Sequence, residues 1–266
     1  MSVRVEKSGP VTTVIHHRPA QRNAMDPASA EALVAAFESF EADPTASVAV
    51  FWGEGGAFCA GWDLQHASAL AGEDDPLAAL NFDPAQARIP RGPMGPSRLQ
   101  LSKPVIAAVA GPAVAGGFEL ALWCDLRVLE ESAYFGVYCR RWGIPLIDGG
   151  TVRLPRLVGQ GRALDIILTG RKVTAAEALQ IGACERVVPD GQSRAAAEAL
   201  AHEIARFPQG CVRADRQSVY AQHGLAERAA LHSEWAISAS LVVQEGIAGA
   251  TRFSAGLGRH GDFDTL

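Results

Sequence analysis

Two glycine-rich segments contain the backbone groups best suited to chemistry. Residues 53–64 (GEGGAFCAGWDL) leave a strand pattern and turn through small residues to Asp63, and residues 103–125 (KPVIAAVAGPAVAGGFELALWCD) lead from a strand to Gly116 and a helix start. A helix start has unpaired N–H groups and a positive dipole end, and glycine allows close approach. One N–H from each segment could hold an oxygen that gains charge, and losing such a donor costs roughly 3–4 kcal/mol. Each segment alone is also compatible with an ordinary strand-to-helix turn.

Glu119 is the acidic side chain of the second segment. It precedes the apolar residues 120–123 (LALW) on the expected helix. Burying a carboxylate is costly unless it is paired or hydrogen-bonded. The position therefore favours acid/base chemistry, and the alternative is a structural ion pair with Arg140 or Arg141.

The cysteines and histidines favour structural roles. Cysteines at positions 59, 124, 139, 184 and 211 are odd in number and scattered, without a CxxC pair. This predicts reduced thiols of a cytoplasmic protein, and neither a disulfide framework nor a zinc site. Cys139 is expected to be a packed thiol, because a nucleophilic cysteine needs a lowered pKa. His16 and His17, at the end of a strand pattern, are expected to be structural.

Composition and motif spacing argue against several function classes. Lys and Arg total 24 and Asp and Glu total 29, a net charge of −5, so no basic surface for nucleic acid is expected. No apolar run approaches about 18 residues and no apolar leader begins the chain, which predicts a cytoplasmic protein without a membrane span. Residues 53–56 (GEGG) lack GxGxxG spacing, and neither GxxxxGKS nor GxxxxGKT occurs, so nucleotide-phosphate chemistry is unsupported.

Alternating strands and helices must position these residues. Apolar and β-branched runs predict strands at 11–16, 48–52, 105–110, 126–129 and 185–188. Asp26 and Pro27 are expected to begin a helix as its N-cap and first residue, and a short helix is expected over 175–181. This alternation predicts an α/β domain with parallel pairing.

Two regions depart from the alternation. Residues 65–104 are rich in Pro and Gly, which predicts an excursion of helix and loop. Beyond residue 192 only helical patterns remain, the last with Trp235 among its packing residues. The 266-residue chain is therefore divided into a core, residues 1–191, and a helical C-terminal region, residues 192–266, which packs on its own core or on a neighbour.

The order and wording of several motifs resemble one protein family. They are residues 17–24 (HRPAQRNA), 57–64 (AFCAGWDL), 103–111 (KPVIAAVAG), 143–154 (GIPLIDGGTVRL), 168–171 (LTGR) and 178–183 (ALQIGA). Over nearly the whole chain they resemble the crotonase family, the enoyl-CoA hydratase/isomerase superfamily. The resemblance implies an α/β fold, a crotonase-like spiral of ββα turns, with a C-terminal helical trimerisation region whose trimers often pair into hexamers.

The resemblance also implies where an acyl-CoA thioester binds. Two backbone N–H groups hold the thioester oxygen in the family, and the motifs place them at Trp62 and Gly116. The Trp62 indole either lines the acyl pocket or shapes its loop. The family's CoA-binding positions correspond to Arg22, Ala24, Ala60 and Asp63, the last in structural support.

The acid/base positions depart from the family pattern. Hydratases of the family use two glutamates, one matching Glu119 and the other falling at Cys139, and a thiol is a poor general base. Asp148 lies in a loop that borders the reaction centre in relatives and is the nearest replacement; alternatively, it caps the turn before Gly149. Positioned acid/base groups contribute roughly 10²–10⁴-fold, so the loss of one need not abolish every activity.

Other residues have roles that the resemblance leaves open. Arg140 and Arg141 could neutralise the carboxylates or reach the CoA phosphates. Phe253 and Arg259 could contact CoA from a neighbouring subunit, as tail residues do in relatives. Residues 65–104 are expected to wall the acyl pocket.

The main functional prediction is an enoyl-CoA hydratase of fatty acid metabolism, a lyase that converts a 2-enoyl-CoA to a 3-hydroxyacyl-CoA. The alternatives are an enoyl-CoA double-bond isomerase, which can use a single base, and a catalytically weak member that only binds acyl-CoA. No metal or redox cofactor is expected, since this chemistry changes no oxidation state at the enzyme, and coenzyme A is carried as part of the substrate. The expected partners are the acyl-CoA substrate and further copies of this chain, in a homotrimer or hexamer, with no nucleic acid and no membrane.

Overall fold

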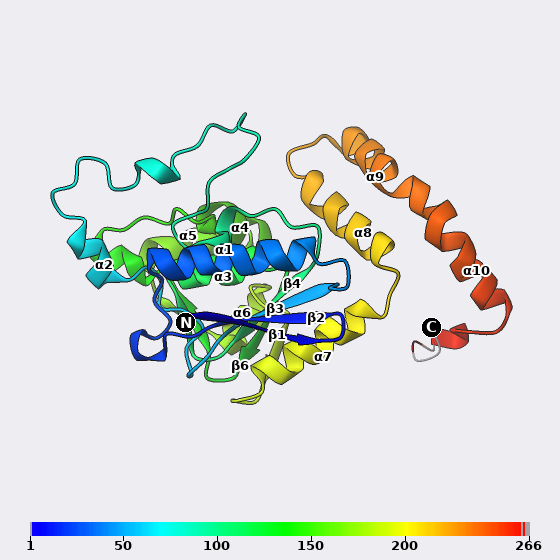
Figure 1. The fold of residues 1–266 in the computed structure, drawn as a ribbon, viewed down its shortest axis with the longest axis horizontal. Coiled ribbons are helices and arrows are strands. Elements are labelled where there is room, and N and C mark those ends of the chain that lie inside the picture. Colours follow the sequence, from blue (N-terminus) through cyan, green and yellow to red (C-terminus); the bar gives the residue numbers. More distant parts are fainter. Residues whose placement is uncertain (1, 262, 264–266) are drawn as a thin grey trace.

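The structure is a computed structural model, which describes residues 2–261 and 263. Its larger sheet has six strands in the order β1-β2-β3-β4-β6-β9 (Figure 1). All neighbouring strands are parallel except β1 and β2, which confirms the predicted strands and their pairing. The strands are β1 (Val3–Ser8), β2 (Val11–His16), β3 (Val48–Gly53), β4 (Val105–Val109), β6 (Leu126–Glu130) and β9 (Arg186–Val188).

Strand β1 was not predicted, and it forms an antiparallel edge of the sheet. Its sequence, VRVEKS, is mostly charged or polar, and of its residues only Val3 is buried. A two-residue turn at Gly9 and Pro10 leads directly into β2. Such a turn can join only antiparallel strands, because a parallel neighbour needs a long crossover. The predicted parallel pairing therefore does not extend to this edge.

The central strands separate two hydrophobic cores. On β3, Val48 and Val50 belong to the core beneath α7 (Ser193–Ala205), whereas Ala49 and Phe51 belong to the larger core on the opposite face. Successive side chains of a strand point to opposite faces, so burying both faces requires continuous apolar sequence. This is why the central strands were recognisable from their sequence.

Helix α1 (Pro27–Ala42) lies on the face of the larger core and begins as predicted. The Asp26 side chain accepts the backbone N–H of Ser29 at 2.8 Å, and Pro27 is the first helical residue. Phe37 of this helix packs edge-on against Phe51 of β3. The helix is therefore anchored at its N-terminus by a cap and along its length by aromatic packing.

A second sheet consists of β5 (Pro112–Val114), β7 (Tyr134–Gly136) and β8 (Lys172–Thr174). The chain passes from the larger sheet to this one twice, from β4 to β5 and from β6 to β7, and a helix follows each passage. The segment after β3 also reaches the second sheet, because Cys59 forms an isolated parallel bridge with Ala113 of β5. These repeated passages confirm the predicted spiral of ββα turns. The remaining core helices are α2 (Leu64–Ala69), α3 (Gly116–Trp123), α4 (Gly150–Val158), α5 (Gln160–Thr169) and α6 (Ala175–Ile181).

Residues 65–104 form the excursion of helix and loop that was predicted. They hold most of α2 and two 3-10 turns, at Ala78–Leu80 and Pro96–Arg98. The second turn is buried against α1 and α3. The end of this excursion therefore reaches the interior of the core.

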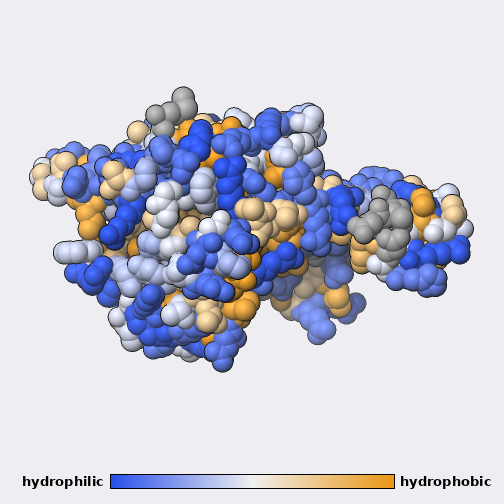
Figure 2. Space-filling view, turned by 90° about the horizontal axis from the view of Figure 1, so that it is seen from below, coloured by the Kyte–Doolittle hydropathy of each residue, from blue (hydrophilic) through white to orange (hydrophobic). Residues whose placement is uncertain are grey.

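The C-terminal region is helical, as predicted, and most of it projects from the core. Helix α7 packs on the larger sheet. The arm comprises α8 (Gln209–Ala221), α9 (Glu227–Leu241), a π-helical turn (Val242–Gly246) and α10 (Ile247–Ser254). It extends to one side of the core (Figure 1), and its far end projects as a separate lobe (Figure 2). The division at residues 191 and 192 stays a prediction.

The predicted packing of Trp235 is wrong for contacts within this chain. Trp235 on α9 is 71% exposed, because the arm extends away from the core that could have covered it. Its packing on a neighbouring subunit stays a prediction. No helix within residues 2–261 is long and apolar enough to cross a lipid bilayer.

The first helix of the arm is tied to the core at Asp125. Arg216 Nε and the Tyr220 hydroxyl, both on α8, donate to Asp125 Oδ1 at 2.8 and 2.7 Å. Asp125 Oδ2 accepts the backbone N–H of Val105 at 2.7 Å. Since Asp125 follows α3, this contact joins the arm to the helix that carries Glu119.

Candidate active site

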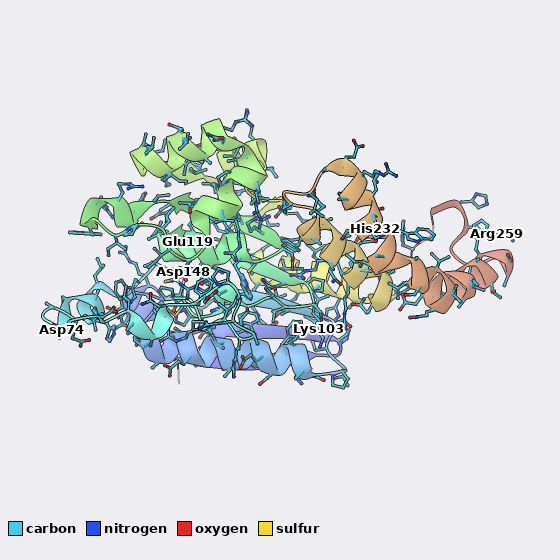
Figure 3. The ribbon with its side chains drawn as sticks, turned by 90° about the horizontal axis from the view of Figure 1, so that it is seen from above. Asp74, Lys103, Glu119, Asp148, His232 and Arg259 are labelled. Carbon is cyan, nitrogen blue, oxygen red and sulfur yellow. The ribbon has the colours of Figure 1, made fainter. Side chains whose placement is uncertain are left out.

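One pocket brings together the residues that were predicted to act on the thioester. It has a volume of about 420 Å³ and is lined by residues including Trp62, Gly116, Glu119, Cys139 and Asp148. Figure 3 shows Glu119 and Asp148 close together in the core, far from His232 and Arg259 on the arm side. Pro93 and Met94 also line the pocket, which confirms that the excursion contributes a wall.

The backbone N–H groups of Trp62 and Gly116 are free to bind a ligand. Neither has an acceptor within the described part of the chain. The two segments touch, because a Cβ placed on Gly61 would lie only 3.3 Å from the nitrogen of Gly116. Unpaired N–H groups are rare in a protein interior. Two of them belong to residues that line one pocket, and unpaired N–H donors suit an electron-rich oxygen.

Tight backbone packing fixes the start of α3. Ala115 has φ +54° and ψ −126°, a strained conformation for a residue with a side chain. A Cβ on Gly116 would lie 2.5 Å from the sulfur of Met94, and one on Gly117 would lie 2.1 Å from the carbonyl oxygen of Cys59. Glycine is therefore required at Gly117 for the helix to approach the backbone of Cys59, and at Gly116 it leaves the space that the Met94 side chain fills.

Glu119 is buried, and one of its carboxylate oxygens is anchored by the backbone. Oε1 accepts the N–H groups of Asp148 at 2.9 Å and Gly150 at 2.8 Å. Oε2 has no hydrogen-bond partner among the described residues. Burial, reinforced by the charge of Asp148, raises the pKa of Glu119 to about 7, since both disfavour the ionised form. Glu119 can therefore release or accept a proton near neutral pH.

Asp148 is also buried, and its side-chain contacts are to the excursion. Oδ1 accepts the backbone N–H of Met94 at 3.0 Å and the hydroxyl of Ser97. The alternative in which Asp148 caps the turn before Gly149 is therefore wrong. Burial raises the pKa of Asp148, and the two hydrogen bonds oppose this rise because they favour the charged form.

Cys139 is a packed thiol, as expected. It is 7% exposed, on the pocket wall beside Glu119. Burial, followed by the charge of Glu119, raises the pKa of this thiol. The neutral thiol is the stable form at this position, so Cys139 is a poor nucleophile and a poor base.

Arg140 and Arg141 pair with neither carboxylate, so the predicted neutralising ion pair is wrong. Arg140 donates to the carbonyl of Ile167. Arg141 donates to the carbonyl of Tyr138 and lies over that ring at 4.8 Å. Neither guanidinium group forms an ion pair with Glu119 or Asp148 among the described residues. Arg141 lines the pocket, and its contact with a CoA phosphate stays a prediction.

The four predicted CoA-binding positions divide into two groups. Arg22 and Ala60 line the pocket, whereas Ala24 and Asp63 do not. Asp63 caps α2, and its Oδ2 accepts a hydrogen bond from Arg18 at 3.0 Å. Arg18 also donates to the carbonyl of Ala24. Asp63 and Ala24 thus support the segments that bear Arg22 and Ala60.

The two histidines lie outside the pocket, in agreement with their expected structural role. His16 is fully buried without a hydrogen-bond partner for either ring nitrogen within the described chain. Burial lowers the pKa of His16 to about 4, so the ring is neutral. His17 Nδ1 pairs with Glu54 at the surface.

The tail residues Phe253 and Arg259 do not reach the pocket of their own chain. The Arg259 guanidinium lies 5.6 Å from the centre of the Phe253 ring, beyond the end of the arm (Figure 3). Contact with CoA bound to a neighbouring subunit stays a prediction.

Comparison with known proteins agrees with this fold and this pocket. The enoyl-CoA hydratase/isomerase family model matches residues 6–254. The chain belongs to the enoyl-CoA hydratase/isomerase family. The enoyl-CoA hydratase EchA19 of Mycobacterium tuberculosis is 39% identical over 207 residues, covering 75% of this chain and 73% of that protein. The carnitinyl-CoA dehydratase of Salmonella arizonae is 37% identical over 205 residues, covering 76% and 74%.

Solved structures of enoyl-CoA hydratases have the same fold as this family member. The enoyl-CoA hydratase EchA1 from Mycobacterium marinum superposes with a TM-score of 0.85 at 29% identity, covering 96% of each chain. The enoyl-CoA hydratase from Bacillus anthracis gives a TM-score of 0.85 at 30% identity and the same coverage. The predicted crotonase-like α/β fold with a helical C-terminal region is confirmed, and trimerisation through that region stays a prediction.

Three residues beside the carboxylates of this enoyl-CoA hydratase/isomerase were not predicted from the sequence. Met94 and Ser97 donate to Asp148, and Arg153 on α4 donates to the carbonyl oxygens of Asp148 at 2.8 Å and Ser97 at 2.7 Å. The available signal was the closely spaced Gly92 and Gly95, which form a tight turn with reciprocal backbone hydrogen bonds. A tight turn in a long loop indicates ordered structure, but it does not reveal which residue the loop contacts.

Proposed function

We propose that this family member is an enoyl-CoA hydratase, which adds water to a 2-enoyl-CoA to give a 3-hydroxyacyl-CoA. The observation that carries the proposal is that two residues with unpaired backbone N–H groups and two residues with buried carboxyl groups line one pocket. The first pair suits an oxygen that becomes charged, and the second suits proton transfer. Relatives named enoyl-CoA hydratase and carnitinyl-CoA dehydratase support this reaction class.

Trp62 and Gly116 hold the thioester oxygen through their N–H groups. When a water oxygen bonds to C3, the electrons of the C2=C3 bond move towards the carbonyl, and an enolate forms. The negative charge of the enolate is largely on the thioester oxygen. Preorganised N–H donors bind this charged oxygen more strongly than the neutral carbonyl, and each is worth about 3–4 kcal/mol in comparable sites.

Glu119 and Asp148 divide the proton transfers between them. Asp148 accepts a proton from the attacking water: burial raises its pKa, which makes it a better base, and the hydrogen bonds to Oδ1 favour its charged form. Glu119, with a pKa of about 7, gives its proton to C2 as the enolate returns to a thioester. Water is thereby added across C2=C3, and transfer of a proton from Asp148 back to Glu119 through solvent restores the enzyme.

Coenzyme A takes part only as a portion of the substrate. Arg22 and Ala60 bind the CoA portion from the pocket wall, and Ala24 and Asp63 support them through Arg18. The reaction changes no oxidation state, so the proposed mechanism uses no metal and no redox cofactor.

The arm joins this chain to further copies in a homotrimer or hexamer. Trp235 is 71% exposed, and Ile247 and Phe253 are each 58% exposed, so the arm presents apolar side chains that a second copy can cover. Phe253 and Arg259 then contact the CoA portion of a substrate bound to a neighbour. A cytoplasmic location suits the five free cysteines, because thiols stay reduced there.

Incubation of the purified protein with crotonyl-CoA in isotope-labelled water tests the proposal. We expect the conjugated enoyl absorbance to fall and the label to appear at C3 of the product. Conversion of a 3-enoyl-CoA to the conjugated form without hydration would establish the isomerase alternative. Tight binding of crotonyl-CoA with neither reaction would establish a binding protein. Either of these two results would overturn the proposal.

A further inference from the structure

The carboxylate of Asp148 is held at one oxygen only. Oδ1 accepts the backbone N–H of Met94 at 3.0 Å and the hydroxyl of Ser97, whereas Oδ2 has no hydrogen-bond partner among residues 2–261. Ser97 is 1% exposed and Asp148 is 3% exposed, so bulk water does not compete for their contact. The arrangement leaves one oxygen for the pocket that Asp148 lines.

The surroundings fix the position of the Ser97 hydroxyl. Arg153 Nη2 donates to the carbonyl of Ser97 at 2.7 Å, and Nη1 donates to the carbonyl of Asp148 at 2.8 Å. A Cβ on Gly92 would lie 1.9 Å from Ser97 Oγ and 2.5 Å from Asp148 Oδ1. Glycine at this position therefore leaves the space that the hydrogen bond occupies.

We propose that Ser97 is a positioning residue for the reaction. Its hydroxyl donates to Asp148 Oδ1, which favours the ionised carboxylate and leaves Oδ2 for the attacking water. The inference rests on the proposed function, in which Asp148 is the proton acceptor. A Ser97 hydroxyl that served only to fill buried space would have no effect on the charge of Asp148.

Charged and titratable groups face Asp148 from several elements. Glu119 lies on α3, Cys59 follows β3, Arg98 is next to Ser97, and Arg153 lies on α4. Burial raises the pKa of Asp148, whereas the Ser97 hydrogen bond lowers it, and the two arginines lower it further. Ser97 differs from the arginines because it contacts the carboxylate itself.

The pH dependence of kcat in Ser97→Ala tests this role. The half-point of the limb that rises with pH should move upward by about one pH unit, because a hydrogen bond to a charged group has been lost. At pH values below the half-point, kcat of Ser97→Ala should be about tenfold lower than that of the wild type, and the difference should disappear as the pH rises. The matched control is Ser102→Ala, an exposed serine of the same excursion, whose profile should equal that of the wild type. A uniform loss without a shifted limb would overturn the proposal.

Carbon NMR of isotope-labelled aspartate gives a readout that does not need activity. Loss of a resonance in Asp148→Asn identifies the Asp148 carboxyl, and its titration should move upward in Ser97→Ala. An unmoved titration would overturn the proposal. If Ser97→Ala fails to fold, Ser97→Cys, which keeps a weak donor, should show a smaller shift in the same direction.

A double variant separates Ser97 from the remainder of the site. If Ser97 acts through Asp148, adding Ser97→Ala to Asp148→Asn should lower kcat no further, whereas multiplied losses would overturn the proposal. If the wild type fails to hydrate crotonyl-CoA while the NMR titration still moves, the proposed hydratase function is wrong and the Ser97 contact is real. Isomerisation of a 3-enoyl-CoA is then the reaction in which the kinetic role of Ser97 is tested.

Discussion

The core and the arm differ in where they place their apolar residues. Phe37 and Phe51 in the core are fully buried, whereas Trp235 and Ile247 on the arm are 71% and 58% exposed. The core has a buried apolar interior within one chain, whereas α9 and α10 have no buried residue. Contiguous exposed apolar residues on a folded protein indicate a surface that binds a partner.

The pocket lies in the core, whereas the exposed apolar surface lies on the arm. All residues that line the pocket lie between Arg22 and Asp148, in the core. The arm meets this region at Asp125, which directly follows the segment that carries Glu119. Substitutions in the pocket should thus change the rate without changing assembly, whereas substitutions on α9, such as those at Trp235, should act first on assembly.

The largest expected effect is that of Glu119→Gln on the rate. It removes the proton that the mechanism gives to C2, so kcat should fall by about 10²–10⁴-fold while affinity for CoA and subunit assembly stay unchanged. Steady-state hydration of crotonyl-CoA measures kcat, equilibrium binding of coenzyme A measures the affinity, and sedimentation measures assembly. Glu203→Gln, an exposed change on α7, is the matched control. Unchanged turnover would exclude Glu119 from the chemistry.

Glu119 should also make the stability of the core depend on pH. Its pKa is raised to about 7 from 4.5, so the folded state binds more protons than the unfolded state between these values. Stability therefore falls as the pH rises through this window, by at most about 3 kcal/mol, and then stays constant. Urea unfolding of the wild type and Glu119→Gln at about pH 5 and about pH 8 measures the difference. If the free energy of unfolding fell equally in both proteins between these pH values, the raised pKa of Glu119 would be contradicted.

Trp235→Ser should weaken self-association without unfolding the core. A central aromatic residue of an interface is worth about 2 kcal/mol, so the dissociation constant should rise about 30-fold. Sedimentation over a range of protein concentrations measures this change. Glu234→Gln, a polar change at the neighbouring exposed position, should leave association unaltered. An unchanged mass distribution in Trp235→Ser would place the interface elsewhere.

Tyr220→Phe should have the smallest effect and should act on the joint between the two regions. It removes the hydroxyl that donates to Asp125 at 2.7 Å, while Arg216 keeps its own contact. The free energy of unfolding should fall by about 1 kcal/mol, and kcat should stay the same. Chemical denaturation and crotonyl-CoA kinetics measure the two quantities. A large loss of kcat would show that the arm influences the pocket through this joint.

Local sequence was sufficient to predict the features that depend on local physics. Continuous apolar runs predicted β3 and β4 because strands buried on both faces have no polar alternation. Asp26 was predicted as a helix cap because its carboxylate reaches the N–H groups of the first turn. Strands β5, β7 and β8 were not predicted; each has three residues, and none has the two adjacent valines of the equally short β9, which was predicted.

The sequence by itself determined that Glu119 is a buried carboxyl group on an apolar helix beside a glycine-rich turn. The tertiary structure alone decided that Asp148 is held by Ser97, which lies 51 positions away in the chain. It likewise decided that Arg153, instead of Arg140 or Arg141, braces the loop of Asp148, and that Trp235 is exposed. The physical reason is that hydrogen bonds and burial between distant segments depend on how the elements pack, and that packing leaves no periodic signal in the residues that make the contact.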